Sequence, residues 1–592
     1  MEIENRTDET VWIGLYNLDD TAYSATLFPW GARKKLEKKS RLTVHPNRAK
    51  VQVVFWTSGA FGRMYAKPKS FFTTGATICS DKHGYYVYNR IGEPTAKDKI
   101  DHIVVLMLEN RSFDNLMGWL YDDKNNIPPR NIPSPTSGEP RFDGLVENKY
   151  WNTLVAGEHD TAPESERVYA TKGSSDTKPD PNPREVCPSF VEQMFGTDSP
   201  DADQKPNMWG FMQNYSGLKD NKDVDGIMSC FKPDQVPNMS KLATDFAVSD
   251  RWFGPLPSET WPSRSFLHAG TSFGMLNNCD QKETENCVPN FFVYAGKRTI
   301  FDVLAEQDIR WAVYQDAAVV GTLLSAQFWT IHQKLKWHAY HLGDLKHQLA
   351  QTRAPQYIFI EPSYVPPFAN DQHPPHSVAE GDKLIAKVYK ILKDSGLWHK
   401  TMLIVTYDEH GGCYDHSPPP TALPPDDSKA QFKVGEINPF AQYGPRVPAI
   451  VASPYVEPGT VFRGEPGREY DHTSILATIR DWVFSGKPDI LGDNPRIKNA
   501  PTVWPVLTRT VAGDEEVALT EPVSDSAGSE RESSEQFSYR QKIIRAMSEA
   551  ERIVAVECDG DIERGADPQK NERYFQLILE KMAELEWDQG DD

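Results

Sequence analysis

Acidic and amide side chains follow three apolar runs of this sequence, at points where a buried strand would end. HIVVLMLEN places Glu109 and Asn110 after the first run, QYIFIEP places Glu361 after the second, and MLIVTYDEH places residues 408–410 after the third. The carboxyl ends of parallel strands form one edge of an open α/β sheet, and ligands bind at that edge. Carboxylates gathered there repel one another unless a cation or a shared proton intervenes. We therefore expect a metal site, although each acid taken singly could cap a helix or turn.

The expected metal ligands are Glu109, Asn110, Asp408 and Glu409, which offer almost only oxygen. Such hard ligands suit Ca²⁺, Mg²⁺ or Mn²⁺, and one divalent ion of this kind is predicted. Zn²⁺ stays open as an alternative, although imidazole or thiolate ligands would favour it more. Two glycines at 411–412 would let the backbone bend closely around the ion.

The elements that must position these residues alternate along the chain as in an α/β fold. Strands are expected at 103–108, 309–315, 357–360, 402–407 and 447–452, and helices at 113–120, 382–393 and 473–483. Two stretches rich in Pro, Asn and Asp, 121–180 and 415–445, are expected to be loops.

The chain has 592 residues, which is too long for one ordinary core. Its composition, 39% hydrophobic and 25% charged, excludes collagen-like and wholly disordered proteins. The sequence contains no run of about 18 apolar residues, so no membrane-spanning helix is predicted. The expected units are a small β-sandwich (1–97), a catalytic domain (98–510), an acidic linker (511–535) and a helical C-terminal segment (536–592) with helices at 536–556 and 569–587.

The net charge of −20 is unevenly spread, with 15 Lys and Arg against 9 Asp and Glu in 1–97, and 9 against 22 in 514–592. The overall acidity argues against nucleic acid as the main partner. The aromatic and basic composition of 1–97 would suit a module that binds a membrane surface or a partner protein. An ordinary sandwich core with a solvated basic loop explains the same composition, and we favour it.

Five blocks, in order along the chain, resemble the signature blocks of the phosphoesterase family: HIVVLMLENRSFDNLMG, TWPSRSFLHAGTS, NDQHPPHSV, TYDEHGGCYDHSPPP and GPRVPAIVASPYVEPG. That family contains bacterial phosphatidylcholine-hydrolysing phospholipases C, plant non-specific phospholipases C and an acid phosphatase. The resemblance implies an alkaline-phosphatase-like α/β core, in which helices flank a central, mainly parallel sheet. It also implies one active-site metal and a hydroxyl nucleophile.

On this resemblance Glu109 and Asn110 would bind metal and phosphate, and Asp408 and Glu409 would bind metal. Thr260 of the TWPSR block would be the nucleophile and a further metal ligand, because the family has a Thr or Ser before Pro-Asn-Arg. A threonine hydroxyl is a poor nucleophile at its free pKa, and metal coordination stabilises its alkoxide.

The resemblance also implies substrate contacts. Arg264 would hold the nucleophile's loop or meet a phosphate oxygen, in a block where Ser263 replaces the family's Asn. A further block, NPREVCPSFVEQMFG, departs most from the family pattern, and in it Glu185 falls where the family has an acid or a histidine. His410 and Asn110 would stabilise the non-bridging phosphate oxygens.

The NDQHPPH block supplies His373 and His376, either of which would protonate the leaving alcohol. General acid help of this kind is typically worth about 10²–10⁴-fold in rate. Each histidine could equally be a structural residue. Arg446, Asp471 and His472, from GPRVP and YDHTS, are expected to support the site from behind.

The chain is therefore predicted to be a metal-dependent phospholipase C. It would cleave glycerophospholipids, phosphatidylcholine first among them, to diacylglycerol and a phosphorylated headgroup through a phosphothreonine. The alternatives are a broad-specificity acid phosphatase and a lipid-binding module without catalysis, although the intact Thr260, Asp408 and Glu409 count against the module.

The start, MEIENRTDET, is polar and lacks the features of a Sec-type signal peptide. Seven cysteines without a CxxC pair favour synthesis in a reducing compartment. An active phospholipase would endanger its own cell's membrane. We therefore expect cytosolic synthesis and export by a signal-independent machine, as a toxin effector with peripheral membrane contact and a carrier or immunity partner. A housekeeping cytosolic enzyme is the equal alternative.

Overall fold

The computed structural model describes residues 2–6, 11–17, 34–43, 51–57, 64–66, 75–81, 84–88, 95–121, 127–136, 139–219, 221–279, 297–317, 324, 327–328, 338–351, 354–364, 368–483, 490–514 and 517–520. The predicted helices at 536–556 and 569–587, and most of the predicted linker, lie outside these residues. Among the helices described, none combines the length and the apolar character needed to cross a bilayer.

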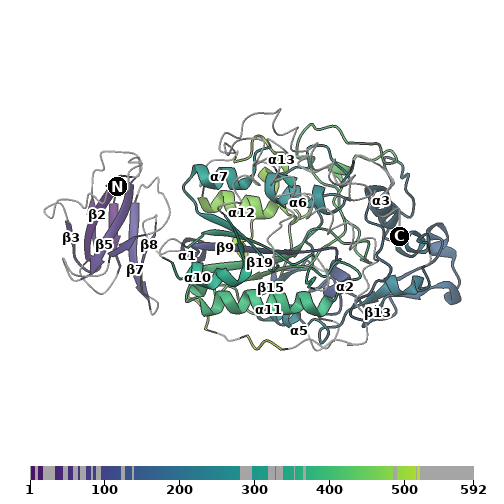
Figure 1. Ribbon diagram of the computed structural model, residues 1–592, viewed down its shortest axis with the longest axis horizontal. Helices are drawn as coiled ribbons and strands as arrows, with labels where there is room; N and C mark the ends of the chain where they lie inside the picture. The colour runs from purple at the N-terminus through teal and green to yellow at the C-terminus, as the bar shows by residue number, and fades with distance from the viewer. Residues whose placement is uncertain are drawn as a thin grey trace, which may run out of the picture.

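A nine-stranded sheet forms the centre of the region that follows the N-terminal strands (Figure 1). Its middle strand is β9 (His102–Leu108), which pairs in parallel with β19 (Thr401–Tyr407) on one side and β18 (Tyr357–Glu361) on the other. Every residue of these three strands is buried, as expected for parallel strands covered on both faces. Their long apolar runs are thus the sequence signal of the core.

The sheet extends on both sides of this centre. Beyond β18 lie β16 (Trp311–Gln315) and β17 (Ala339–His341), both parallel. Beyond β19 lie, in order, β20 (Ala449–Ala452), β15 (Ala247–Ser249), β21 (Thr460–Phe462) and β10 (Arg130–Ile132). β20 runs antiparallel to both of its neighbours, and the other described strands of the sheet run in one direction.

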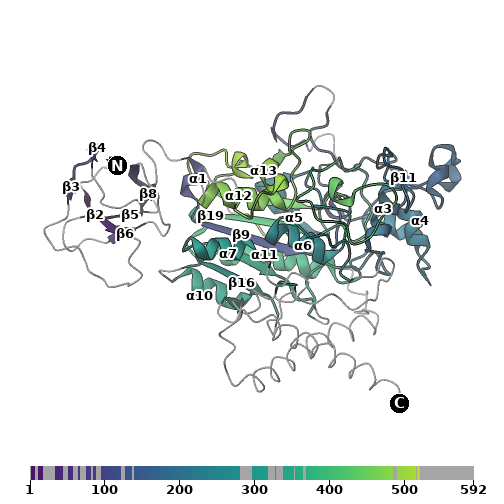
Figure 2. The ribbon, with the colours of Figure 1, turned by 90° about the horizontal axis from the view of Figure 1, so that it is seen from above.

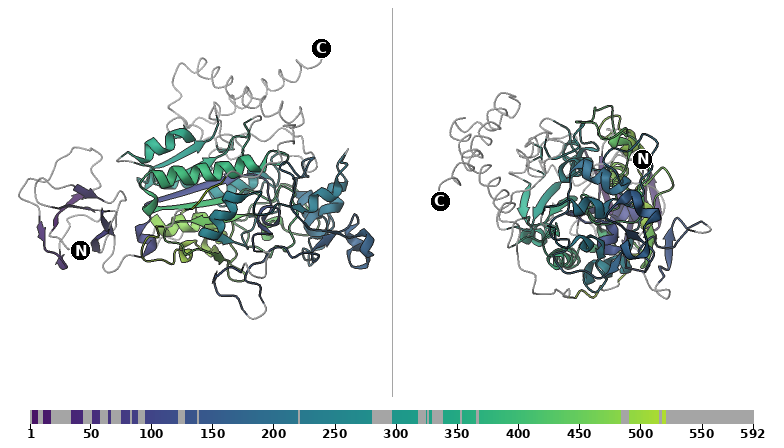
Figure 3. Two further views of the ribbon diagram at one scale, coloured as in Figure 1. Left: turned by 90° about the horizontal axis from the view of Figure 1, so that it is seen from below. Right: turned by 90° about the vertical axis from the view of Figure 1, so that its right-hand side faces the viewer.

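Helices cover both faces of the sheet (Figures 1 and 3). One layer contains α5 (Pro237–Asp245), α10 (Leu345–Leu349) and α11 (Val378–Asp394). The other contains α6 (Thr260–Ala269), α7 (Ile300–Glu306), α12 (Thr473–Val483) and α13 (Pro495–Asn499). The prediction of a mixed α/β fold with a mainly parallel sheet is confirmed.

A smaller group of elements lies beyond the carboxyl ends of the parallel strands, on the side of α2 (Phe113–Met117) (Figures 1 and 2). It comprises α3 (Cys187–Phe195), α4 (Phe211–Ser216) and the short strands β11 (Trp151–Asn152), β12 (Val168–Tyr169), β13 (Thr171–Lys172) and β14 (Ser229–Cys230). These elements share a second apolar core that includes Phe195, Phe211 and Met212. The prediction that 121–180 is all loop was therefore wrong in part, because three pairs of short strands use it.

The N-terminal region contains two four-stranded sheets. One has the order β4 (Ser40–Thr43), β1 (Glu2–Asn5), β7 (Gly75–Asp81), β8 (Gly84–Tyr88), and the other β3 (Lys34–Leu36), β2 (Val11–Asn17), β5 (Val51–Thr57), β6 (Met64–Ala66). The prediction of β structure is confirmed here. The packing of the sheets as a sandwich and the domain boundaries stay predictions.

Most predicted element boundaries lie within two residues of those observed, and 473–483 matches α12. The helix predicted at 382–393 begins earlier, at Val378, because the Ser377 hydroxyl accepts the N–H of Glu380 as a cap. The helix predicted at 113–120 ends at Met117.

Candidate active site

The acidic strand ends meet at one edge of the sheet. Because β9 lies between β19 and β18 in a parallel arrangement, Glu109 and Asn110, Asp408 and Glu409, and Glu361 emerge at neighbouring positions. All five side chains are at most 2% exposed. The structure therefore brings the expected metal ligands together, and their roles stay predictions.

Asp408 organises the backbone at this edge. Its Oδ1 accepts the N–H of Asn110 at 3.0 Å and that of Glu409 at 2.8 Å. Asn110 has a φ of 57°, and Gly411 lies so close to it that a Cβ on Gly411 would stand 2.1 Å from the Asn110 carbonyl oxygen. The expected close backbone approach at 411–412 thus requires glycine, as the sequence predicted.

Arg264 lies beneath the acids rather than at the surface. Its guanidinium is 3.2 Å from Asp408, 3.5 Å from Glu109 and 3.5 Å from Glu361. Burial opposes its charge, but Tyr364 and these carboxylates outweigh burial and raise the pKa of Arg264. Of the two predicted roles, holding the nucleophile's segment fits this position better than meeting a phosphate oxygen.

Thr260 is the first residue of α6 and precedes Arg264 by one helical turn. Residues four apart share a helix face, so the hydroxyl is carried on the face that Arg264 ties to the strand ends. Asn278 fixes this helix start, since its side chain accepts the N–H of Trp261 and its own N–H bonds the Glu259 carboxylate. Thr260 is 7% exposed.

Ser263, which replaces the family's Asn, supports the same turn. Its hydroxyl donates to the carbonyl of Ser258 at 3.1 Å. The departure from the family pattern thus leaves the start of α6 held in place.

Glu185 comes to the same site from a distant segment. Its carboxylate lies 3.3 Å from Nε2 of His373 and accepts the Asn182 amide at 2.8 Å. Burial alone would raise the pKa of Glu185, but His373, Asn182 and Asn110 outweigh burial and lower it. The structure therefore places Glu185 beside Asn110, although its block departs most from the family pattern.

Glu409 shows that the strand ends hold an excess of negative charge. Burial, followed by the neighbouring Glu185 and Asp408, raises the pKa of Glu409 well above its ordinary value. Oε1 of Glu409 and Oδ1 of Asn110 are buried without a hydrogen-bond partner among the described residues. Two orphaned oxygens in an anionic pocket fit a divalent cation.

The two histidines of the NDQHPPH block sit beside this pocket, with ring centres 5.9 Å apart. His373 has a carbonyl oxygen, that of Pro374, 2.6 Å from Nδ1 and the Glu185 carboxylate near Nε2. Acceptors on both sides favour a ring that carries hydrogen on both nitrogens. His376 places Nδ1 2.7 Å from Asp371, which leaves its Nε2 for another contact.

His410 is enclosed more deeply than its predicted phosphate contact requires. Its Nε2 donates to the Gln193 side chain at 2.7 Å, and its ring packs on Phe190 at 4.1 Å. Burial lowers the pKa of His410 to about 3, so the ring is neutral. Its Nδ1 lies 3.7 Å from Glu409, which is beyond hydrogen-bond distance.

Of the three predicted supporting residues, one, His472, contacts the strand ends from behind. His472 donates from Nε2 to the carbonyl oxygen of Asp408 at 2.7 Å and accepts the Trp252 indole N–H at Nδ1. Asp471 instead pairs with Arg496 at 2.8 Å, farther from the acids.

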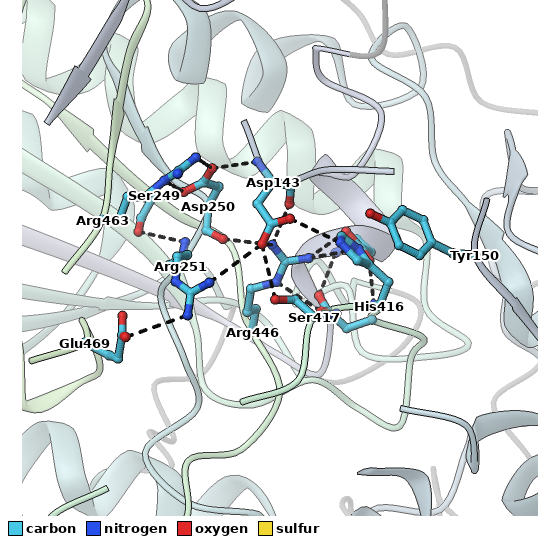
Figure 4. A network of polar contacts seen from close by, with 12 residues as sticks. Asp143, Tyr150, Ser249, Asp250, Arg251, His416, Ser417, Arg446, Arg463 and Glu469 are labelled. Carbon is cyan, nitrogen blue, oxygen red and sulfur yellow. Dashed lines mark hydrogen bonds and ion pairs between the residues drawn. The ribbon is translucent and has the colours of Figure 1, made fainter. Parts of the chain in front are cut away.

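A second acidic cluster surrounds Arg446 (Figure 4). Asp114, Asp415 and His416 each offer a ligand atom within 4.8 Å of the others, a spacing that could hold a metal ion. Arg446 already lies among them, 2.9 Å from Asp114 and 3.0 Å from Asp415. His416 lies 2.6 Å from Asp114.

The two candidate metal positions differ in their balance of negative and positive side chains. Although burial opposes it, contacts with Asp114 and Asp143 raise the pKa of His416 to about 9, so His416 is protonated at neutral pH. Around Arg446, three carboxylates face two cations. At the strand ends, five carboxylates face one arginine and one histidine. The larger anionic excess favours a cation at the strand ends.

Sequence reasoning missed several residues that shape the site. Gln193 and Asp371 orient His410 and His376, and Glu361, noticed as a strand end, pairs with Arg264. Asp371 lies inside the NDQHPPH block, which was a usable signal. No such sequence signal marks Gln193, because its partner His410 is 217 positions away.

The model of the Phosphoesterase family matches residues 100–483. The chain is 33% identical over 440 residues to non-specific phospholipase C3 of Arabidopsis thaliana, covering 71% of this chain and 75% of that one. It is 26% identical over 460 residues to non-hemolytic phospholipase C of Burkholderia pseudomallei, covering 70% and 58%. Among solved structures it is similar to a protein in the alkaline phosphatase superfamily from Vibrio parahaemolyticus, with a TM-score of 0.27, 11% identity and coverage of 45% and 64%.

The extent of the family match and the identity to the plant relative, taken with the site above, lead to one conclusion. This chain belongs to the phosphoesterase family and is a phosphoric ester hydrolase of the phospholipase C type.

Proposed function

We propose that the protein is a metal-dependent phospholipase C that cleaves phosphatidylcholine to diacylglycerol and phosphocholine. The carrying observation is the anionic excess at the strand ends beside the first turn of α6, which presents Thr260. A buried cluster of this charge suits a divalent cation and, through it, an anionic phosphodiester.

The residues proposed to hold the cation are Glu109, Asn110, Asp408, Glu409 and Thr260. The orphaned oxygens of Asn110 and Glu409 support this set. When bound, the ion would act as a Lewis acid that stabilises an alkoxide and polarises phosphoryl oxygen. The oxygen ligands favour Ca²⁺, Mg²⁺ or Mn²⁺ over Zn²⁺.

The first step is attack of the Thr260 Oγ on phosphorus, in line with the ester oxygen of diacylglycerol. A bond forms between Oγ and phosphorus, and the bond from phosphorus to the glycerol oxygen breaks. The threonine then carries phosphocholine as an ester.

His373 is the proposed proton donor to the departing glycerol oxygen. Its Nδ1 is held by a carbonyl oxygen, which orients the ring, and the proton that it would give up is the one on Nε2, which faces Glu185 at 3.3 Å until the glycerol oxygen takes that place. In the second step water attacks phosphorus, gives one proton to His373 and releases phosphocholine, and the Thr260 oxygen leaves in the deprotonated form in which it attacked. His376, which Asp371 orients, is proposed to contact the substrate phosphate.

The test compares long-chain phosphatidylcholine and p-nitrophenyl phosphate as substrates, with and without chelator, and identifies the products. The proposal expects diacylglycerol and phosphocholine, loss of turnover with chelator and recovery with added divalent ion. Faster hydrolysis of the monoester would support an acid phosphatase instead. Release of free choline would contradict cleavage on the glycerol side of phosphorus.

Export by a signal-independent route, with a carrier or immunity partner, remains part of this proposal. A phospholipase C that acts on phosphatidylcholine needs contact with a membrane that contains this lipid. Cell fractionation of the producing organism would test it.

A further inference from the structure

Two adjacent aliphatic side chains point outward where β11 leads into the 3₁₀ helix Ala156–Thr161. Leu154 is 55% exposed and Val155 is 48% exposed, whereas Thr153 and Ala156 on either side are almost fully buried. A single exposed aliphatic residue is common on protein surfaces. Two neighbours at the tip of an otherwise anchored segment call for a physical explanation.

An aromatic stack joins residues on either side of the tip. The ring of His159 lies parallel between Trp151 at 3.7 Å and Trp209 at 4.0 Å, with 3° between each pair of planes. The Arg167 guanidinium stands 4.4 Å from the Trp151 ring. Trp151 and Trp209 are partly exposed, and amphipathic aromatic rings of this kind are enriched where protein meets the membrane interface.

Hydrogen bonds fix the backbone of the tip and connect it to the active site. The Ala156 N–H donates to the Gln213 side chain at 2.9 Å, and Gln213 donates to Glu192 on α3 at 2.7 Å. The next residue of α3, Gln193, holds His410. Figure 2 shows β11, α3 and α4 together beyond the same end of the sheet. The tip is therefore attached to the frame that surrounds the catalytic residues.

The surface around the tip is acidic. Between 146 and 167 the exposed carboxylates are Glu147, Glu158, Asp160, Glu164 and Glu166, and the cations are Lys149 and Arg167. An anionic bilayer attracts basic segments and repels an acidic one. A zwitterionic bilayer instead presents cationic headgroup ammonium groups outermost, which complement carboxylates beside an apolar tip.

We propose that Leu154 and Val155 form the tip that inserts into a phosphatidylcholine-rich lipid surface, with the exposed carboxylates between 146 and 167 facing the choline groups. This inference rests on the proposed function, since it names the surface from which the site takes its substrate. It assigns lipid docking to the catalytic region and not to the basic N-terminal sheets.

The test uses the full chain with Leu154→Ser and Val155→Ser combined, and Val511→Ser as the control at a 72% exposed aliphatic residue elsewhere. Vesicle binding is measured by sedimentation, with phosphatidylcholine alone or mixed with anionic lipid. Turnover is measured on the same vesicles and on p-nitrophenyl phosphorylcholine, which is soluble. Melting temperatures verify that each variant is folded. Leu154→Trp serves as a gain variant.

The double variant is expected to bind phosphatidylcholine vesicles about fivefold or more weakly, with turnover of the soluble ester within about twofold of the parent. Leu154→Trp should bind more tightly, the control should be unchanged, and anionic lipid should weaken binding by the parent. Unchanged vesicle binding by the double variant would overturn the proposal. Phe368, a 73% exposed residue of another loop, gives a second comparison. If Phe368→Ser weakens vesicle binding and the double variant does not, the proposal is also overturned. Because binding is scored without turnover, failure of the proposed chemistry would be seen separately.

Discussion

Nε of Arg264 lies 3.2 Å from Oδ2 of Asp408, so the helix that begins with Thr260 is tied directly to the carboxyl end of β19. The proposed nucleophile, Thr260, and the proposed metal ligand Asp408 come from segments nearly 150 positions apart. Buried ion pairs of Arg264 connect the two segments.

Removing the Arg264 charge should therefore loosen the site and the fold. Arg264→Met leaves the buried carboxylates of Asp408, Glu109 and Glu361 without their shared cation, which typically costs about 3–5 kcal/mol of unfolding free energy. Urea unfolding measures the loss, and Arg264→Lys should recover part of it. If Arg264→Met has the same free energy of unfolding as the parent, the ion pairs make no net contribution to stability.

Metal content distinguishes the two acidic clusters. Asp408→Asn removes one ligand charge and should lower the amount of Ca²⁺ or Mn²⁺ retained after dialysis by about tenfold or more. The matched control is Asp415→Asn in the Arg446 cluster, which should keep the parent's metal content. Elemental analysis of the purified proteins decides, and the reverse pattern would place the ion at Asp415.

The general acid should matter most when the leaving group is poor. His373→Gln should slow hydrolysis of phosphatidylcholine about 10²–10⁴-fold but slow p-nitrophenyl phosphorylcholine much less, because p-nitrophenolate leaves without a proton. His376→Gln should affect both substrates alike. Equal losses on both substrates in His373→Gln would remove it from the proton-donor role.

The Arg446 cluster should make stability depend on pH through His416. Because contacts with Asp114 and Asp143 raise the pKa of His416 from 6.5 to about 9, its contribution is complete below pH 6.5 and is lost as pH rises through 9. A shift of this size corresponds to roughly 3 kcal/mol. His416→Gln should therefore be much less stable than the parent at pH 6.5 and similar to it at pH 9.5. A stability difference that stays constant across this range would show that His416 is not the titrating group.

The sequence predicted the part of the site that local patterns encode. β9, β18 and β19 are apolar runs that end in acids, and parallel pairing alone brings Glu109, Asp408 and Glu361 to one edge. By contrast, α6 was not predicted as a helix, since all ten of its residues are buried and no polar face marks its period.

Contacts between distant segments could not be predicted from the sequence. The pairing of Glu185 with His373 and of Gln193 with His410 depends on how α3 and its flanking loops cover the sheet edge. The short strands within 139–230 are two residues long, which is too short to show the alternation of apolar and polar residues that marks a strand in a sequence. Their positions follow from tertiary packing.

The central claim is that Thr260 attacks phosphorus, and the covalent adduct tests it most directly. The enzyme is mixed with phosphatidylcholine, quenched in acid within the first turnover, digested and mapped by mass spectrometry. The account predicts a phosphocholine adduct on the peptide that contains Thr260, present with Thr260→Ser and absent with Thr260→Ala, which should also lose turnover. An adduct on another residue, or Thr260→Ala activity within tenfold of the parent, would contradict it.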